Sequence, residues 1–198
     1  IMPNRRIGFI GLGNMGGRIT RCLVDSGLDV LGFDTRPENI TASGAAPADS
    51  VRALAAEADV VLLSLPDSRV VEAVTGGPDG LIAHSRAGQI VIDLSTASPD
   101  STRRIASEFA DRGAMFLDAG ISGGAAAAEK GQLTLMVGGD AAALGSVSDV
   151  LDPIASHVYH VGESGAGHVT KLLNNFLNAI ALSATSEVML AAKKSGLD

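Results

Sequence analysis

The hydrophobic positions of this chain alternate between short continuous runs and longer stretches with helical spacing. Short apolar runs bounded by turn residues indicate buried strands, and apolar residues that recur every three or four positions indicate helices. Strands are expected at about residues 7–10, 30–33, 59–65, 89–94, 115–119, 133–137 and 157–161, and helices at about 16–26, 50–57, 67–74, 125–129 and 141–151, with another beginning near Pro99. This alternation predicts an α/β fold with a doubly wound, mostly parallel sheet.

The end of the chain carries a different pattern. Residues 162–192 begin with three glycines and continue without Gly or Pro, which predicts one long helix. Four polar residues at positions i, i+3, i+4 and i+7 share one face of it: Lys171, Asn174, Asn175 and Asn178. Asparagine is a mediocre helix former, so this face predicts the wall of a polar pocket, although a lone helical lysine is more often solvated. Residues 179–192 are apolar on more than one face, which is typical of a buried helix.

Composition narrows the class of protein. The chain has 198 residues, of which 46% are hydrophobic, so a substantial core can form. The net charge of −7 argues against nucleic acid or an anionic membrane as partner. Cys22 is the only cysteine, so a reducing, cytoplasmic location is expected. No apolar run reaches the roughly 18 residues of a membrane span, and glycines interrupt the apolar stretch after Arg6, so no signal peptide is expected.

A motif of the form G-x-G-x-x-G lies at the first strand-to-helix turn, in the segment Gly11-Leu12-Gly13-Asn14-Met15-Gly16. In a dinucleotide-binding turn, Gly11 permits the tight turn, Gly13 lets the backbone approach a pyrophosphate, and Gly16 allows close helix–strand packing. The N–H groups at the start of the helix then face the phosphates. A glycine-rich turn without a ligand is the alternative, but the position between a strand and a helix favours a nicotinamide dinucleotide.

Two side chains after the second strand bear on the choice of cofactor. Asp34 can accept hydrogen bonds from both ribose hydroxyls of NAD, and it would repel a 2′-phosphate. Arg36 can accommodate a 2′-phosphate, or its guanidinium can stack on the adenine. Because Asp34 occupies the position at the end of the strand, the sequence predicts NAD and leaves NADP as the alternative.

Further candidate positions follow other strands, because ligands of such sheets lie beyond the carboxyl ends. This rule points to Leu65–Pro66 and to Ser95–Thr96. Ser122-Gly123-Gly124 can expose backbone N–H groups as a nest for a carboxylate or phosphate, with a flexible turn as the alternative. His157 and His160 fall on opposite faces of a predicted strand, and His84 falls in a predicted loop, so no metal site is expected.

Together these segments resemble the β-hydroxyacid dehydrogenase family, which includes 3-hydroxyisobutyrate dehydrogenases and tartronate semialdehyde reductases. The similarity covers essentially the whole chain, and the glycine motif is followed in family order by Asp93-Leu-Ser95-Thr96 with Pro99, Asp118-Ala-Gly-Ile-Ser122-Gly123-Gly124, Gly131-Gln-Leu133 with Met136-Val-Gly138-Gly139, and Gly165-Ala-Gly167 with Lys171-Leu-Leu-Asn174-Asn175. Gly120 departs from the family, in which a proline is usual. The cofactor domain is also similar to that of 6-phosphogluconate dehydrogenases, but Asn174 stands where those enzymes have histidine.

The resemblance implies a Rossmann-type cofactor domain and a role for individual residues. Lys171 is implied to be the catalytic lysine with Asn175 beside it, and the substrate carboxylate is implied to lie at Ser122, Gly123 and Gly124. The implied contacts of the nicotinamide cofactor are Leu65, Pro66, Val70 and Thr96. The implied reaction is hydride transfer between NAD and the hydroxyl carbon of a small 3-hydroxy acid or its semialdehyde. An imine reductase and a non-catalytic cofactor-binding module are the alternatives.

The resemblance also divides the chain. Residues 1–162 correspond to the dinucleotide-binding domain, and residues 163–198 to a long interdomain helix that begins an otherwise absent all-α domain. In the family this domain closes the active site and builds the dimer, so a homo-oligomer (dimer or tetramer) is implied. On this expectation the 198 residues bind NAD but are incomplete for catalysis, and without a lid Lys171 keeps a pKa near its ordinary value.

Overall fold

Eight strands form a single sheet in the computed structural model, which describes residues 5–197. Residues 1–4, at the start of the predicted domain 1–162, and Asp198 lie outside the described residues. The strand order is β3-β2-β1-β4-β5-β6-β7-β8. The strands are β1 (Arg6–Ile10), β2 (Asp29–Phe33), β3 (Ala46–Pro47), β4 (Val60–Leu63), β5 (Ile90–Asp93), β6 (Met115–Ser122), β7 (Leu133–Gly138) and β8 (Ala155–Gly162).

The first six strands of this sheet all run parallel to their neighbours, as the sequence predicts for a doubly wound fold. Their order, 3-2-1-4-5-6, is that of a Rossmann-type sheet. β7 then pairs antiparallel with β6, and β8 pairs parallel with β7 at the edge. The predicted fold class is confirmed, and the reversal at β7 is an addition that the sequence pattern did not indicate.

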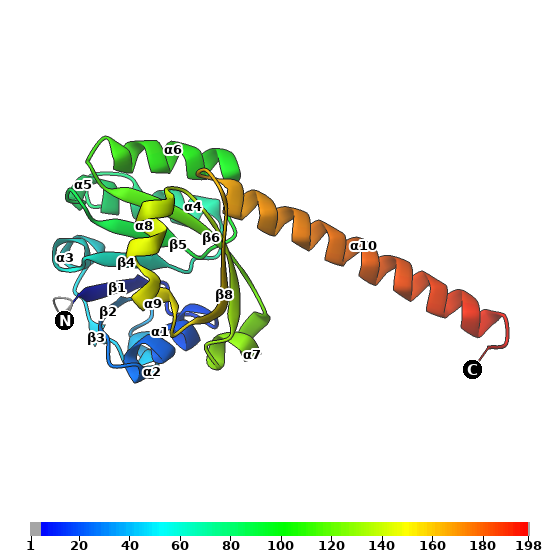
Figure 1. Ribbon diagram of the computed structural model, residues 1–198. Helices are drawn as coiled ribbons and strands as arrows, with labels where there is room; N and C mark the ends of the chain where they lie inside the picture. Colours follow the sequence, from blue (N-terminus) through cyan, green and yellow to red (C-terminus); the bar gives the residue numbers. More distant parts are fainter. Residues whose placement is uncertain (1–4, 198) are drawn as a thin grey trace.

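Helices cover both faces of the sheet (Figure 1). One core contains side chains of α1 (Gly16–Asp25), α7 (Gly124–Glu129), α8 (Ala141–Ser146) and α9 (Ser148–Leu151), and the other contains side chains of α3 (Val51–Glu57), α4 (Ser68–Thr75), α5 (Leu81–His84) and α6 (Pro99–Ala110). In β4, Val60 and Leu62 belong to the first core, whereas Val61 and Leu63 belong to the second. A strand buried on both faces has no polar positions, which is why β4 reads as a continuous apolar run.

Several local predictions are corrected by the structure. β6 continues through Gly120 to Ser122 because its pairing with β7 supplies hydrogen-bond partners that the turn-like sequence does not reveal. The helix expected over 141–151 is two helices, α8 and α9, which meet at Val147. His84 ends α5 instead of lying in a loop, and its Nε2 is 2.9 Å from the carbonyl oxygen of Pro78. The sequence pattern also missed α2 (Pro37–Ser43) and β3.

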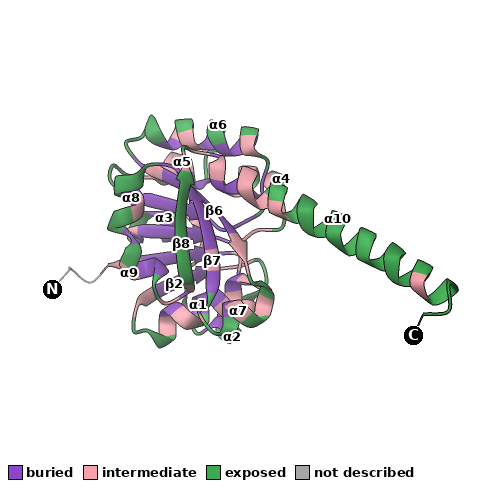
Figure 2. Cartoon of the chain, turned by 45° about the vertical axis from the view of Figure 1, so that its right-hand side comes forward, coloured by how far each residue is buried: buried purple, intermediate pink, exposed green. Residues whose placement is uncertain are grey.

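The last helix, α10 (Ala166–Lys194), extends over 29 residues as one continuous element. Its first two turns pack on the body, and most of the remainder projects away from it (Figures 1 and 2). Residues 179–192 have the apolar pattern of a helix that is buried in a complete domain, and here they are exposed, which agrees with the absence of the all-α domain expected from the resemblance. Ile180 is 50% exposed and Met189 is 66% exposed, because no other described element covers them. None of the helices in residues 5–197 has the length and hydropathy needed to cross a bilayer, α10 included.

Candidate active site

The G-x-G-x-x-G segment forms the turn between β1 and α1. Gly11 has a φ of +89°, and a Cβ there would lie 2.3 Å from the carbonyl oxygen of Ser64, so only glycine fits. A Cβ on Gly16 would lie 1.8 Å from the carbonyl oxygen of Gly11, which explains why α1 can begin so close to the strand. Gly13 differs, because a Cβ there would meet no heavy atom within 4 Å. The turn is therefore tight at both ends and open at its centre.

Asp34 follows β2 and fastens this turn to the neighbouring loop. Its Oδ2 accepts a hydrogen bond from the backbone N–H of Leu12 at 2.7 Å. Its Oδ1 accepts hydrogen bonds from the backbone N–H of Arg36 at 2.9 Å and from the side-chain amide of Asn39 at 3.1 Å. The carboxylate thus braces the glycine turn as well as facing the cavity beside it. Asn39 was missed by the sequence reasoning, because α2, on which it lies, was not predicted.

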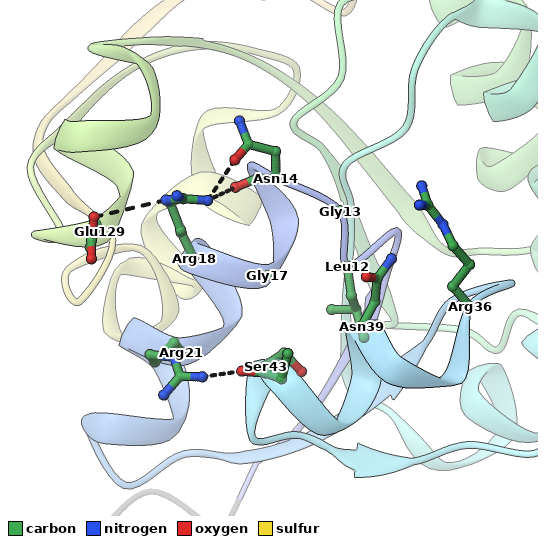
Figure 3. Close-up of a pocket in the computed structure, with 11 residues that line it drawn as sticks. Leu12, Gly13, Asn14, Gly17, Arg18, Arg21, Arg36, Asn39, Ser43 and Glu129 are labelled. Carbon is green, nitrogen blue, oxygen red and sulfur yellow. Dashed lines mark hydrogen bonds and ion pairs between the residues drawn. The ribbon is translucent and has the colours of Figure 1, made fainter.

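Two adjoining cavities lie beside the glycine turn. The first has a volume of about 350 Å³ and brings together most of the predicted cofactor positions: Gly11, Gly13, Asp34, Arg36, Leu65, Pro66 and Val70. The second, of about 560 Å³, lies against α1 and shares Gly13, Arg36 and Asn39 with the first (Figure 3). Arg18 and Arg21 also line it. Most of the positions that the strand-end rule indicated thus line the 350 Å³ cavity. The rule did not indicate the arginines of α1, which line the 560 Å³ cavity.

The ends of β4 and β5 are joined by a side-chain hydrogen bond. Ser95 is buried, and its Oγ accepts a hydrogen bond from the backbone N–H of Leu65 at 2.9 Å. Thr96, the next residue, is exposed and lines neither of the two cavities. In this structure Ser95 therefore fixes the shape of the loop that lines the cavity, while Thr96 lies outside it.

Lys171 lies on α10 directly above β6. A Cβ on Gly120 would lie 2.6 Å from the Cβ of Lys171, so the helix can pass this close only because residue 120 has no side chain. Alternate residues of a strand point to the same face, so Asp118, Gly120 and Ser122 all face α10. The polar face of the helix and the Ser122–Gly124 segment therefore lie on one side of the sheet. Asn174 is half-buried there, whereas Asn175 and Asn178 are exposed.

The Ser122–Gly124 segment links β6 to α7 with an unusual backbone. Gly123 has a φ of +121° and Gly124 a φ of +68°, values that favour glycine at both positions. Both glycines are exposed, and Ser122 is half-buried at the end of the strand. A Cβ on Gly124 would meet nothing within 4 Å, so its backbone faces open space. The segment has the accessibility that a carboxylate-binding nest requires.

The first turn of α10 is held by a buried carboxylate. Asp118 Oδ1 accepts a hydrogen bond from the N–H of Gly165 at 2.7 Å, and Oδ2 accepts one from the N–H of His168 at 2.8 Å. The helix passes so close to the sheet that a Cβ on Gly167 would lie 2.3 Å from the carbonyl oxygen of Asp118. The sequence analysis noted Asp118 only as part of a family block, since a partner about fifty positions away leaves no local signal.

Burial changes the acid–base behaviour of two groups in this region. Partial burial lowers the pKa of Lys171 below its ordinary value, which increases the fraction of neutral amine at a given pH. The sequence analysis expected this pKa to stay near its ordinary value in an open pocket, and the structure adds that partial burial on β6 shifts it downward. Complete burial raises the pKa of Asp93, and nearby His168 partly offsets the rise.

The sequence analysis gave no metal site, and the described residues 5–197 contain no group of three or more His, Cys, Asp or Glu side chains arranged to hold one. His157 stacks on Tyr159, with ring centroids 6.1 Å apart. His160 Nε2 is 2.7 Å from the carbonyl oxygen of Gly139. Both histidines thus have structural contacts on the exposed strand β8.

Comparison with known protein families matches nearly the whole chain. Residues 6–162 match the NAD binding domain of 6-phosphogluconate dehydrogenase, and residues 165–198 match the family described as NAD-binding of NADP-dependent 3-hydroxyisobutyrate dehydrogenase. A 2-(hydroxymethyl)glutarate dehydrogenase of Eubacterium barkeri is 37% identical over 97% of this chain and 65% of that protein. An NAD-dependent L-serine dehydrogenase of Pseudomonas aeruginosa is 39% identical over 98% of this chain and 66% of that protein. The chain thus spans about 65% of the length of these relatives.

Solved structures agree with this comparison. A 3-hydroxyisobutyrate dehydrogenase of Mycobacterium tuberculosis, solved with L-serine, superposes with a TM-score of 0.93 at 36% identity, covering 99% of this chain and 67% of that one. An imine reductase of Myxococcus stipitatus superposes with a TM-score of 0.89 at 22% identity, covering 99% of this chain and 68% of that one. The second likeness is one of fold alone, so the comparisons favour the hydroxyacid dehydrogenases over the imine reductases.

Proposed function

Because this chain belongs to the β-hydroxyacid dehydrogenase family, we propose that it is the cofactor-binding part of an oxidoreductase that acts on a small 3-hydroxy acid. A hydride passes between the hydroxyl-bearing carbon of the substrate and a nicotinamide cofactor, NAD in preference to NADP. The division of the chain at residues 162 and 163, into a cofactor domain and an interdomain helix, is part of this proposal.

The observation that carries the proposal is the placement of Lys171 above β6, on the same side as Ser122. In oxidation the neutral amine of Lys171 accepts the hydroxyl proton, and in reduction the ammonium group returns it. A lysine can serve as a base only when part of it is neutral, and burial lowers its pKa in that direction. The cofactor, when bound, supplies the hydride acceptor or donor.

The remaining residues orient the substrate. The backbone N–H groups of Gly123 and Gly124, with the hydroxyl of Ser122, bind the substrate carboxylate and so fix the position of the reacting carbon. An asparagine of α10 orients the substrate hydroxyl toward Lys171. Asn175 is the position that the family resemblance gives for this role. Asn174, the preceding residue, is half-buried and is the alternative.

On the cofactor side, the pyrophosphate lies over the open centre of the Gly11–Gly16 turn, against the free N–H groups that precede α1. Asp34 accepts hydrogen bonds from the ribose hydroxyls while it continues to hold Leu12 N–H, because each carboxylate oxygen can accept more than one hydrogen bond. Arg36 and the apolar side chains of Leu65 and Val70 enclose the adenosine half. Thr96, which is exposed at the end of β5, contacts the nicotinamide half.

The substrate class follows from the relatives. Their names specify 3-hydroxyisobutyrate, L-serine, L-threonate and 2-(hydroxymethyl)glutarate, all of them hydroxy acids. We therefore propose a carboxylate that carries a hydroxyl group two carbons from the carboxyl carbon. A panel of these four acids, with NAD and with NADP, is the first assay. The alternatives are tested in the same assay, since a cyclic imine reduced in preference to these acids indicates an imine reductase, and binding without turnover indicates a non-catalytic module.

The decisive experiment replaces Lys171 in a protein that carries this chain together with a C-terminal helical domain like that of its relatives. Lys171→Ala is expected to lower kcat about 10²- to 10⁴-fold, the usual contribution of a general acid–base group, with cofactor affinity within about twofold. Lys193→Ala, at the exposed far end of the same helix, is the matched control and keeps normal turnover. Near-normal kcat in Lys171→Ala would contradict the proposed role.

The exposed apolar side chains of α10 motivate a proposal on assembly. Leu173, Phe176 and Leu177 are 59–66% exposed, and an apolar surface of this kind normally meets another chain. We propose that the protein is a homo-oligomer and that the 198 residues alone bind NAD with negligible turnover and self-associate. Light scattering that gives a monodisperse monomer at micromolar concentration would contradict the association.

A further inference from the structure

A pair of buried ionisable side chains links β5 to the start of α10. Asp93 is the last residue of β5 and is 1% exposed, and His168 lies in the first turn of α10 and is fully buried. Asp93 Oδ2 and His168 Nε2 are 4.0 Å apart. Neither atom has a hydrogen-bond partner among the described residues 5–197, although both are shielded from solvent. Two buried polar atoms that have only each other must be matched as donor and acceptor.

The hydrogen bonds around the pair limit where its protons can lie. If no proton lay between Nε2 and Oδ2, a nitrogen lone pair would face a carboxylate oxygen in a buried site, which is strongly unfavourable. On the other side of the ring, Nδ1 is 2.8 Å from Thr102 Oγ1, and the Thr102 hydroxyl donates to the carbonyl oxygen of Ser98 at 3.1 Å. With the single hydroxyl proton used there, Nδ1 is the donor to Thr102. One proton then lies either on Nε2 or on Oδ2, and in both cases the pair has no net charge.

The charges near the pair are consistent with this assignment. Asp118, on β6, lies close enough to raise the pKa of Asp93 further, although burial is the largest cause of the rise. Arg103, on α6, lies beside Gly165, where its Nε would be 3.2 Å from a Cβ on that glycine. Lys171 lies one helical turn beyond His168. A pair with no net charge avoids placing a second uncompensated negative charge next to Asp118.

The pair connects the two halves of the candidate site. Asp93 Oδ1 accepts a hydrogen bond from Ser95 N–H at 2.9 Å, and Ser95 Oγ in turn holds Leu65 N–H, which belongs to the loop that lines the cofactor cavity. On the other side, the backbone of His168 is bound to Asp118, and the same helix presents Lys171 one turn later. Hydrogen bonds therefore connect the cofactor loop to Asp93, the 4.0 Å contact connects Asp93 to His168, and His168 lies on the helix of the lysine.

We propose that Asp93 and His168 form a buried pair with no net charge and act as positioning residues, which fix Lys171 relative to the loop that lines the cofactor cavity. The proposal deepens the proposed function, because it rests on Lys171 as the acid–base group of that site. A buried ionisable pair is a weak source of stability compared with apolar side chains of the same volume. A role in placing the helix accounts for its position between Ser95 and Lys171 in a way that stability alone does not.

The test measures the titration of Lys171 in this chain by following its side-chain ¹³Cε signal with pH. In Asp93→Asn and in His168→Gln the first turn of α10 loosens, the amine becomes better hydrated, and the titration midpoint rises toward the ordinary value of the lysine pKa. The backbone amide signals of Leu65 and Lys171 shift in the same two variants. Thr75→Val is the matched control, because it removes a buried hydroxyl that bonds only within α4 and leaves the Lys171 midpoint unchanged.

Folded variants in which the Lys171 midpoint does not move would overturn the positioning role, since a merely structural pair would lower stability without changing that titration. If Asp93→Asn does not fold, His168→Gln decides the question. The double variant supplies a second measurement, because direct pairing of the two side chains makes their effects on unfolding non-additive, and additive effects would overturn the pairing. Absence of turnover with every hydroxy acid would contradict the proposed function but would leave the Lys171 titration result intact.

Discussion

The molecule contains two glycine-rich turns that lead from a strand into a helix, and their surroundings differ. The first glycine turn (Gly11–Gly16) joins β1 to α1, and the second glycine turn (Gly162–Gly167) joins β8 to α10. In the first, the backbone N–H groups of Gly13, Asn14 and Met15 have no acceptor within the part of the chain that the structure describes. In the second, Asp118 accepts hydrogen bonds from Gly165 and His168.

The two glycine turns also differ in the room that they leave for a side chain. A Cβ on Gly13 would enter an open cavity, whereas a Cβ on Gly167 would collide with the carbonyl oxygens of Asp118 and Met136 at 2.3 and 2.4 Å. Both turns are rich in glycine, yet only the first leaves room for a ligand. A glycine-rich turn at the start of a helix therefore marks a site for negative charge, and the fold decides whether a ligand or a protein carboxylate supplies it.

The most direct way to break the second glycine turn is to remove its carboxylate. Asp118→Ala leaves two buried N–H groups without an acceptor, and the expected loss in the free energy of unfolding is about 3–5 kcal/mol, measured by urea denaturation. Asp34→Ala, the corresponding change at the first glycine turn, is expected to cost less than about 1.5 kcal/mol, because its partners can bind water instead. A loss of under about 1 kcal/mol in Asp118→Ala would show that the carboxylate does not hold the helix.

Alanine at the central glycines separates packing from ligand binding. Gly167→Ala forces α10 away from the sheet and is expected to cost about 2–3 kcal/mol of stability. Gly13→Ala fits the free protein without a contact, so its stability changes by less than about 1 kcal/mol, but its methyl group occupies the cavity and lowers NAD affinity at least about tenfold. Thermal denaturation and NAD titration of both variants test this contrast. Unchanged NAD affinity in Gly13→Ala would show that the pyrophosphate does not bind at the first glycine turn.

Asp34 sharpens the comparison on the ligand side. NAD(H) is expected to bind more tightly than NADP(H). Asp34→Ala is expected to reduce the ratio of the two affinities by up to about tenfold, or 1.4 kcal/mol, because the repulsion of a 2′-phosphate is removed. Both cofactors are titrated into the unmodified protein and the variant. Asp140→Ala, which removes a helix N-cap carboxylate remote from the cavities, is the control. Equal affinities for the two cofactors in the unmodified protein would contradict the assignment.

The smallest expected effect is a pH dependence of the free energy of unfolding, which comes from Asp93, the carboxylate that faces His168 just after the second glycine turn. The folded-state pKa of Asp93 is raised, so the native state binds this proton more tightly than the unfolded state does. The contribution of Asp93 to stability is therefore fully present at pH values below its pKa in the unfolded state. This contribution is lost as the pH rises through its pKa in the folded state, by at most about 1.4 kcal/mol per pH unit. Asp93→Asn cannot ionise and should lack this fall. Parallel denaturation curves at several pH values above 3.8 compare the two proteins.

Much of the fold was predictable because its signals are local. The buried strands β1, β4 and β5 read as apolar runs, and the helices α3 and α4 lie close to the predicted ranges 50–57 and 67–74, with Ser50 and Asp67 capping their first turns. The glycine turn and Asp34 were placed correctly for the same reason, since the motif and its strand lie within one βαβ unit. The predicted roles of these residues in binding remain predictions, although their convergence on one cavity was foreseen.

Other features could be found only in three dimensions. The antiparallel step at β7 and the break at Val147 depend on which elements lie beside each segment, and a period of two or 3.6 residues does not encode that. Lys171 illustrates both levels. The sequence placed it on the polar face of a long helix, but its desolvation comes from the close approach to Gly120.

The sequence by itself thus determined the elements, the fold class and the glycine turn that faces open space, because these follow from side-chain periodicity and backbone freedom at neighbouring positions. Only the tertiary structure decided what the second glycine turn binds and which partner buried His168 has. Gly165 and His168 donate to a carboxylate 47 and 50 positions earlier in the chain. Any buried acceptor would satisfy those N–H groups, so strand order and register, not local sequence, select Asp118 and place Asp93 opposite His168.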